Sequence, residues 1–158
     1  MLNPLARMRR KGVQESETPR KTAAARTGTA GEDCAAAMLQ NMGWRILARN
    51  WRSGHLELDI VAEERDTLVF VEVKTRTSGG MQRPFEALTA AKKKRLLRAA
   101  QAWLAEHEWW DRPCRFDLVC VEAENGTYRT ELIRNVIEYT DLGTRNAVGG
   151  GHAAWQPW

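Results

Sequence analysis

The chain has 158 residues and a formal net charge of +4 at neutral pH, from 24 Lys or Arg against 20 Asp or Glu. That length suits one domain with its own apolar core. No apolar run approaches the ~20 residues that a membrane-spanning helix needs, so no membrane partner is expected. The three cysteines form no CxxC pair and have no histidine at ligand spacing. This pattern argues against a structural zinc site and favours a reducing, cytoplasmic location.

Residues 1–28 carry the excess positive charge. They contain seven Lys or Arg and two Glu, a net of +5, so the rest of the chain sums to −1. Because large apolar side chains are scarce there, we predict a disordered basic extension. It either attracts phosphate groups without sequence specificity or only improves solubility. A folded domain is predicted at residues 29–140, followed by a disordered Gly-rich tail at residues 141–158.

The folded part is predicted to start with a helix and a strand. Thr29 and Glu32 match a capping box, which predicts a helix beginning at Thr29, and Gly43 is a typical C-terminal signal. Residues 44–51 then alternate well enough for a first strand. The guanidinium of Arg52, just after this strand, suits bidentate contact with a phosphate; the alternative is an ordinary surface arginine.

Two apolar strands joined by a tight charged turn are predicted next. The runs HLELDIVA, from residue 55, and TLVFVEVKT, from residue 67, are rich in Val, Ile, Leu and Phe. Arg65 and Asp66 between them suit a hairpin loop in which Glu64 pairs with Thr67. Apolar residues on both faces of each strand predict that the hairpin lies inside a sheet.

The hairpin is predicted to gather charged side chains at one end. Residues two apart on a strand share a face, so counting outward from the turn sets Asp59 opposite Glu72 and Glu57 opposite Lys74. Three buried carboxylates beside one ammonium would be costly unless more positive charge is present. A divalent cation such as Mg²⁺ would supply that charge. A cross-strand ladder of salt bridges is the alternative interpretation.

A loop and a long basic helix are predicted after the hairpin. Arg76 and Arg83 lie on the Gly-containing loop, where they would flank the carboxylates. Residues 85–108 have apolar side chains at helical spacing. The other face of this helix is basic, which suits contact with a nucleic-acid backbone or with solvent alone. Its basic residues are Lys92, Lys93, Lys94, Arg95 and Arg98.

Two further strands complete the predicted domain. They are residues 114–121 and 127–139, joined by a turn at Asn125 and Gly126. The second segment is either a strand throughout or a strand that leads into coil. Asp117, within the first of these strands, is interpreted as a structural hydrogen-bond acceptor. The order of elements, a helix, three strands, a helix and two strands, predicts an α/β fold with a mixed sheet flanked by helices.

The spacing of the charged residues also resembles a known signature. Asp59 followed, one hairpin later, by Glu72, Val73 and Lys74 resembles the Asp plus ExK motif of the PD-(D/E)xK nuclease superfamily. The segments GEDCAAAMLQNMGWRILARNWR, ELDIV, LVFVEVKTR and FDLV, in this order, are similar to the YraN-like family of small bacterial proteins. The similarity runs roughly from residue 29 to residue 139. One departure is Leu56, where the family usually has Gly.

The resemblance implies a fold, a cofactor and a set of site residues. The fold would be the restriction endonuclease-like core that Holliday junction resolvases share, and the cofactor Mg²⁺ or Mn²⁺. The implied metal ligands are Asp59, Glu72, the Val73 carbonyl and, in reserve, Glu57. Lys74 would orient or deprotonate the attacking water. Glu32 on the first helix would either complete the metal shell or bind a second ion.

These inferences predict a metal-dependent nuclease that hydrolyses phosphodiester bonds of DNA, with branched DNA favoured by fold analogy alone. A binding module of nuclease fold without catalysis is the main alternative, and RNA as the substrate is a third. The predicted nucleic-acid contacts are Arg52, Arg76, Arg83, Lys92, Lys93, Lys94 and Arg95. A homodimer is possible, although no self-complementary surface can be recognised in the sequence.

Overall fold

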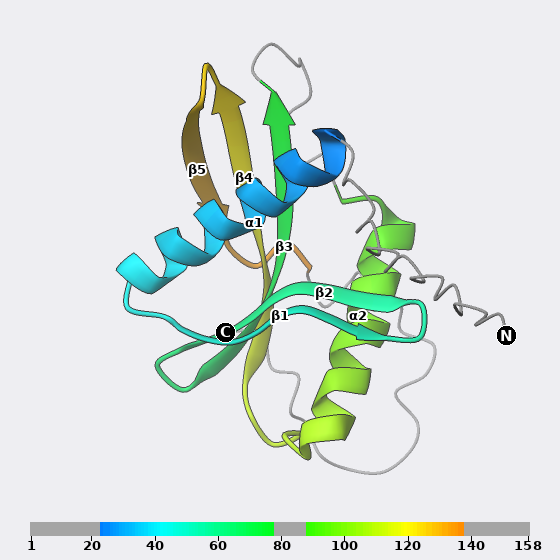
Figure 1. Cartoon of the computed structure of the whole chain (residues 1–158). Helices are drawn as coiled ribbons and strands as arrows, with labels where there is room; N and C mark the ends of the chain where they lie inside the picture. The colour runs from blue at the N-terminus through cyan, green and yellow to red at the C-terminus, as the bar shows by residue number, and fades with distance from the viewer. Residues whose placement is uncertain (1–22, 78–87, 138–158) are drawn as a thin grey trace, which may run out of the picture.

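The computed structural model describes residues 23–77 and 88–137 of the chain (Figure 1). The helices and strands are α1 (Ala23–Asn41), β1 (Arg45–Ser53), β2 (Leu56–Glu64), β3 (Thr67–Thr77), α2 (Ala90–His107), β4 (Cys114–Glu124) and β5 (Thr127–Ile133). This is the predicted order of elements. Within the described residues, no helix is long and apolar enough to span a membrane.

The strands form one five-stranded sheet in the order β1-β2-β3-β4-β5. Only β3 and β4 are parallel, and the other neighbours are antiparallel. The parallel pair needs a crossover connection, which contains α2. The prediction of an α/β fold with a mixed sheet flanked by helices is therefore confirmed.

The register of the β2–β3 hairpin is the one expected from its turn, with Glu64 opposite Thr67. Backbone pairing continues only as far as Ile60 and Val71. Beyond that point β2 pairs with β1 alone, and Figure 1 shows the two strands crossing over α2 at a steep angle to β3 and β4. A hydrogen bond of 3.1 Å from the Trp51 indole to Glu106 ties β1 to α2. The strand β2 thus separates from β3 about half-way along the two strands.

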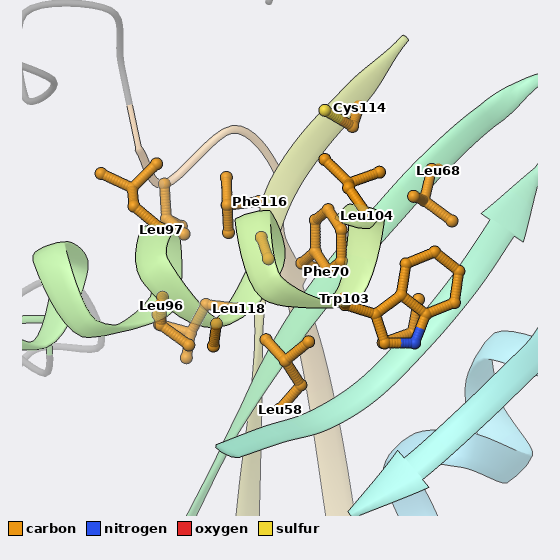
Figure 2. Close-up of a cluster of buried hydrophobic side chains, with 14 of the residues drawn as sticks. Leu58, Leu68, Phe70, Leu96, Leu97, Trp103, Leu104, Cys114, Phe116 and Leu118 are labelled. Carbon is orange, nitrogen blue, oxygen red and sulfur yellow. The ribbon is translucent and has the colours of Figure 1, made fainter. Parts of the chain in front are cut away.

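Each face of the sheet is covered by one helix. On one face, Ala35, Ala36 and Leu39 of α1 pack on a cluster that includes Ile60 and Val71. On the other face, α2 buries a larger cluster around Trp103, shown in Figure 2. The Trp103 ring meets Phe70 edge-on at 6.0 Å between centroids. Apolar residues on both faces of β3 account for its central, fully covered position.

Both helix starts differ from the predictions. The helix α1 begins at Ala23, so Thr29 and Glu32 lie inside it and form no capping box. The run of alanines at residues 23–25 extends the helix, because alanine has the highest helix propensity. The helix α2 begins at Ala90 instead of residue 85, after Thr89, whose hydroxyl accepts a 3.2 Å hydrogen bond from the Lys92 N–H.

The remaining turn agrees with the prediction, but the last strand, β5, ends at Ile133 and not at residue 139, and the chain turns at Asn135, whose φ is 54°. Asn125 and Gly126 have φ values of 49° and 79°, as the predicted Asn-Gly hairpin turn requires, and β4 and β5 flank it. The segments 1–22, 78–87 and 138–158 lie outside the described residues. Arg83, the predicted disorder of residues 1–22 and 141–158, and the end of the domain at residue 140 therefore stay predictions. Residues 23–28, also predicted to be disordered, belong to α1, so the prediction that the folded domain starts at residue 29 is wrong.

A cluster of ion pairs joins the end of β2 to β4 and to the residue that follows β5. The Glu64 carboxylate accepts hydrogen bonds of 2.6 Å from both Arg115 and Arg134. Both guanidinium groups lie over the Trp44 ring, at 5.2 and 5.3 Å from its centroid. The Arg134 and Arg115 hydrogen bonds lower the pKa of Glu64 to about 2. This cluster stabilises the fold on the α1 side of the sheet.

Asp117 belongs to the same cluster. It is 1% exposed and accepts hydrogen bonds of 3.0 and 3.1 Å from Arg115 and of 3.0 Å from the Asn135 N–H. Burial raises the pKa of Asp117 even though these donors lower it. Its neighbour Leu118 faces α2 instead, so Asp117 points to the opposite side of the sheet. The predicted structural role of Asp117 agrees with these contacts.

The helix α1 packs directly on β3 at Gly31. A Cβ placed on Gly31 would lie 2.9 Å from the Thr75 Cβ and closer still to its Oγ1, whereas one on Gly28 meets nothing within 4 Å. Gly31→Ala is therefore expected to lower the free energy of unfolding by about 1–3 kcal/mol through overpacking. Gly28→Ala, in the same helix, should raise it by roughly 0.5–1 kcal/mol.

Urea unfolding followed by circular dichroism measures both effects. Opposite signs for the two substitutions are expected. Equal stability of the Gly31→Ala and Gly28→Ala chains would contradict the close packing of α1 on β3.

Candidate functional site

The charged residues of the hairpin meet where β2 leaves β3. Asp59 is the first residue of β2 beyond the last β2–β3 backbone pair. Its carboxylate accepts a 2.8 Å hydrogen bond from the Val73 N–H. The Asp59 side chain therefore still connects β2 to β3 at the point where the two backbones separate. This bond fixes the Asp59 carboxylate beside β3.

Glu72 lies next to Asp59 on the α2 side of the sheet. It is 3% exposed, and the charge of Asp59 raises the pKa of its carboxyl group. Two ammonium groups approach the same Glu72 oxygen, Oε1: Lys92 at 2.9 Å and Lys74 at 3.6 Å. Asp59, Glu72, Lys74 and Lys92 are called the carboxylate–lysine cluster below.

The two carboxyl groups of this cluster are only partly neutralised by its lysines. Burial raises the pKa of Asp59 most, and the charge of Glu57 raises it further, against the opposing effects of the Val73 N–H and Lys92. Burial also raises the pKa of Glu72, and the charge of Asp59 adds to it, although Lys92 and Lys74 act the other way. For both carboxyl groups the effect of burial is larger than the opposing effect of the lysines. The pair thus still favours additional positive charge.

Glu57 does not join this pair. It pairs with Arg52 across β1 and β2, with 3.0 Å between their charged groups, and its side chain is 41% exposed. The expected position of Glu57 opposite Lys74 is therefore wrong, because counting along a flat ladder ignores the departure of β2 from β3. Within residues 23–77 and 88–137, no three acidic, His or Cys side chains form a group ready to hold a metal ion.

Glu32 is connected to the site only indirectly. It accepts a 2.8 Å hydrogen bond from the Asn50 side chain. Asn50 lies on β1 between Arg49 and Trp51, whose partners Ile60 and Leu58 flank Asp59. Asn50 has a φ of 51°, a left-handed conformation that Asn tolerates better than most residues. The α1 acid is thus attached to the strand position opposite Asp59.

The comparison with known families covers this whole site. The sequence matches the model of a family described as "Uncharacterised protein family UPF0102" over residues 31–121. The chain belongs to this family. The expected membership in the YraN-like family is thereby confirmed, and the matched range contains every residue of the carboxylate–lysine cluster.

Relatives in several bacteria match most of this UPF0102 chain. A UPF0102 protein of Nitratidesulfovibrio vulgaris (strain DP4) is 54% identical over 132 residues, which cover 84% of this chain and 95% of the relative. A UPF0102 protein of Lawsonia intracellularis is 40% identical over 83% of this chain and 96% of its own length. One from Bacteroides thetaiotaomicron is 47% identical over 68% of this chain and 88% of its own length.

The residues predicted to contact nucleic acid lie in different surroundings. Lys94 and Arg95 are exposed on α2, as a surface for phosphate contact requires, and Lys93 is half-buried. Arg76, on β3, lies near Cys120, where its charge partly offsets the burial that raises the Cys120 pKa. Lys92 differs from them because its ammonium contacts Glu72.

The sequence prediction placed Lys92 on the solvent-facing basic surface, together with Lys93, Lys94 and Arg95. The structure shows that it belongs to the carboxylate–lysine cluster instead. One signal in the sequence was available. A lysine in the first turn of a helix is unfavourable beside the positive end of the helix dipole unless an anion lies close by. Only the packing of α2 on the sheet identifies that anion as Glu72.

Proposed function

We propose that this UPF0102 chain is a metal-dependent nuclease of the PD-(D/E)xK superfamily that hydrolyses phosphodiester bonds of DNA. The observation that carries the proposal is the pair of carboxylates at the point where β2 leaves β3, with Asp59 fixed by the Val73 N–H and Glu72 buried beside it. The restriction endonuclease-like identity of the fold is part of the same proposal. The central hairpin and the α2 crossover between β3 and β4 support it.

The donor set fits a hard divalent cation. Mg²⁺ and Mn²⁺ prefer oxygen ligands, and Mg²⁺ commonly sits on one or two carboxylates while it keeps several waters. The ionised carboxylates of Asp59 and Glu72 and the carbonyl of Val73 would hold it. When bound, the metal would polarise the phosphate and lower the pKa of a coordinated water. Glu32, which accepts its hydrogen bond from Asn50 at Oε2, would offer its other oxygen to the metal.

The residues of the chain have separate tasks in hydrolysis. Asp59, held by the Val73 N–H, keeps its carboxylate in one orientation during turnover. Glu72 stays buried below the surface, so its charge is screened little by water. Lys74 is 40% exposed, which leaves its ammonium accessible to substrate. There it would orient the attacking water and offset the negative charge that develops on the phosphate.

A nucleic-acid-binding module without catalysis is the second candidate. It is favoured by the 2.9 Å ion pair between Lys92 and Glu72, which supplies positive charge without a metal. The exposed Lys94 and Arg95 would hold the phosphate backbone in either case. Binding through such residues is expected to weaken steeply with salt.

Cleavage of labelled substrates distinguishes the two candidates. Duplex, flap, four-way-junction and RNA substrates are incubated with the wild type, Lys74→Gln and the control Arg129→Gln, in Mg²⁺, in Mn²⁺ or in chelator. Arg129 is exposed on β5 and is not among the predicted nucleic-acid contacts. We expect the wild type and Arg129→Gln to cleave DNA only with metal. Cleavage by the Lys74→Gln chain should be slower by roughly 10²–10⁴-fold, while the chain still binds DNA.

The substrate that is cut fastest identifies the target. If no substrate is cleaved under any condition although salt-sensitive binding persists, the nuclease proposal is refuted and the binding module is favoured.

A further inference from the structure

Lys92 makes the shorter ion pair of the carboxylate–lysine cluster. Its Nζ lies 2.9 Å from Glu72 Oε1, whereas Nζ of Lys74, the lysine of the ExK motif, lies 3.6 Å from the same oxygen. Glu72 is 3% exposed, and the Lys92 side chain is 30% exposed. One carboxylate oxygen therefore has two cations beside it, and the nearer one comes from α2.

The place of Lys92 on α2 is unfavourable without an anion. It lies three residues after the N-cap Thr89, and the first turn of α2 contains no acidic residue. Cations there meet the positive end of the helix dipole, and Lys93 and Lys94 follow directly in the sequence. Glu72 is the negative partner that offsets this repulsion at Lys92. If Glu72 no longer paired with Lys92, the Lys92 ammonium could pair with another anion.

We propose that Lys92 is the counter-ion of Glu72 in the metal-free protein, and that metal binding transfers its ammonium from Glu72 to the substrate phosphate. This inference rests on the proposed function. A divalent cation bound to Glu72 would repel the ammonium 2.9 Å from Oε1. Lysine has a flexible four-carbon stem, and the partly exposed Lys92 side chain has solvent on one side into which it can swing. The released ammonium would lie beside the reacting phosphodiester.

The two lysines would then have different roles. Lys74 follows Glu72 by two residues on β3 and keeps its place relative to the metal ligands in every state. Lys92 comes from another element and exchanges one anion for another. The metal and Lys92 compete for Glu72, so removal of Lys92 should strengthen metal binding and weaken catalysis at the same time. A purely structural lysine would not produce these opposite effects.

Calorimetric titration with Mn²⁺ in the absence of nucleic acid tests the competition. The chains are the wild type, Lys92→Gln, whose amide still donates a hydrogen bond to Glu72, and Lys94→Gln, a matched exposed control on the same helix. We expect Lys92→Gln to bind Mn²⁺ on the order of tenfold more tightly than the wild type. Lys94→Gln should bind it equally well as the wild type.

Two further measurements complete the test. The melting temperature of Lys92→Gln should fall in chelator, because Glu72 loses its charged partner, and should rise more on addition of Mn²⁺ than that of the wild type. Cleavage by Lys92→Gln at saturating Mn²⁺ should be roughly 10–100-fold slower, and Lys92→Arg should recover part of it.

The outcomes separate this inference from the proposed function. Metal binding and cleavage by the wild type, with unchanged Mn²⁺ affinity in Lys92→Gln, would overturn the competition and leave the nuclease intact. Weaker Mn²⁺ binding by Lys92→Gln would also overturn it. A wild type that binds no metal would overturn both proposals.

Discussion

An Asp59→Asn chain is expected to unfold at a higher temperature than the wild type in chelating buffer, by a few degrees, and to bind neither Mg²⁺ nor Mn²⁺ measurably. The amide oxygen of the substituted side chain can still accept the hydrogen bond from the Val73 N–H. The substitution removes a negative charge that burial disfavours and that raises the pKa of Glu72, so the metal-free fold gains stability. The same change removes a metal ligand, and cleavage should fall on the order of 10³-fold.

The effect on stability should depend on pH. The pKa values of Asp59 and Glu72 are raised above their ordinary values of 3.8 and 4.5. The native chain therefore retains protons that the unfolded chain has released, so the free energy of unfolding falls as the pH rises from those values through the raised ones. The Asp59→Asn chain should lose part of this dependence. Metal affinity should rise over the same pH range, because ligands must be deprotonated.

Melting temperatures between pH 4 and pH 8, in chelator and in excess Mn²⁺, measure both effects. Glu122→Gln is the control, because Glu122 is an exposed acid on β4 that has no part in the site. Its Mn²⁺ affinity should stay close to that of the wild type. A less stable Asp59→Asn chain throughout this range would show that the two lysines fully compensate the carboxyl pair, contrary to the charge balance inferred here.

Asp117→Ala is expected to lower the free energy of unfolding by about 2–4 kcal/mol without changing metal affinity. The substitution leaves the Asn135 N–H without its acceptor and removes one of the two carboxylates that hold the Arg115 guanidinium, the other being Glu64. Metal affinity should not change, because Asp117 lies on the α1 side of the sheet and Glu72 on the α2 side.

Urea unfolding and Mn²⁺ titration of the same sample measure the two quantities. Glu122→Ala, an exposed acid on the same strand, should change stability by less than about 0.5 kcal/mol. Loss of Mn²⁺ binding in a folded Asp117→Ala chain would show that the two faces of the sheet are coupled. Asp117 would then affect metal binding as well as stability, and its role would not be separate from that of Glu72.

Local rules predicted the parts of the site that lie close in sequence. The turn at Arg65 and Asp66 fixes the register of β2 and β3, and side chains alternate with a period of two, so Asp59 and Glu72 follow as neighbours by counting. The apolar runs identified the strands for the same reason. The capping pattern at Thr29 does not mark the start of α1, because the alanines before it have high helix propensity and the helix begins at Ala23.

The sequence by itself determined the order of the elements, the mixed α/β class and the Asp59–Glu72 pair, since each depends on short-range periodicity and turn chemistry. Only the tertiary structure decided which cations meet that pair. Glu57 lies away from the pair because β2 separates from β3 and continues beside β1 alone. Lys92 lies beside Glu72 because α2, which connects β3 to β4, packs on this face of the sheet. Both positions depend on strand twist and helix packing, which act between residues distant in the sequence and leave no local pattern.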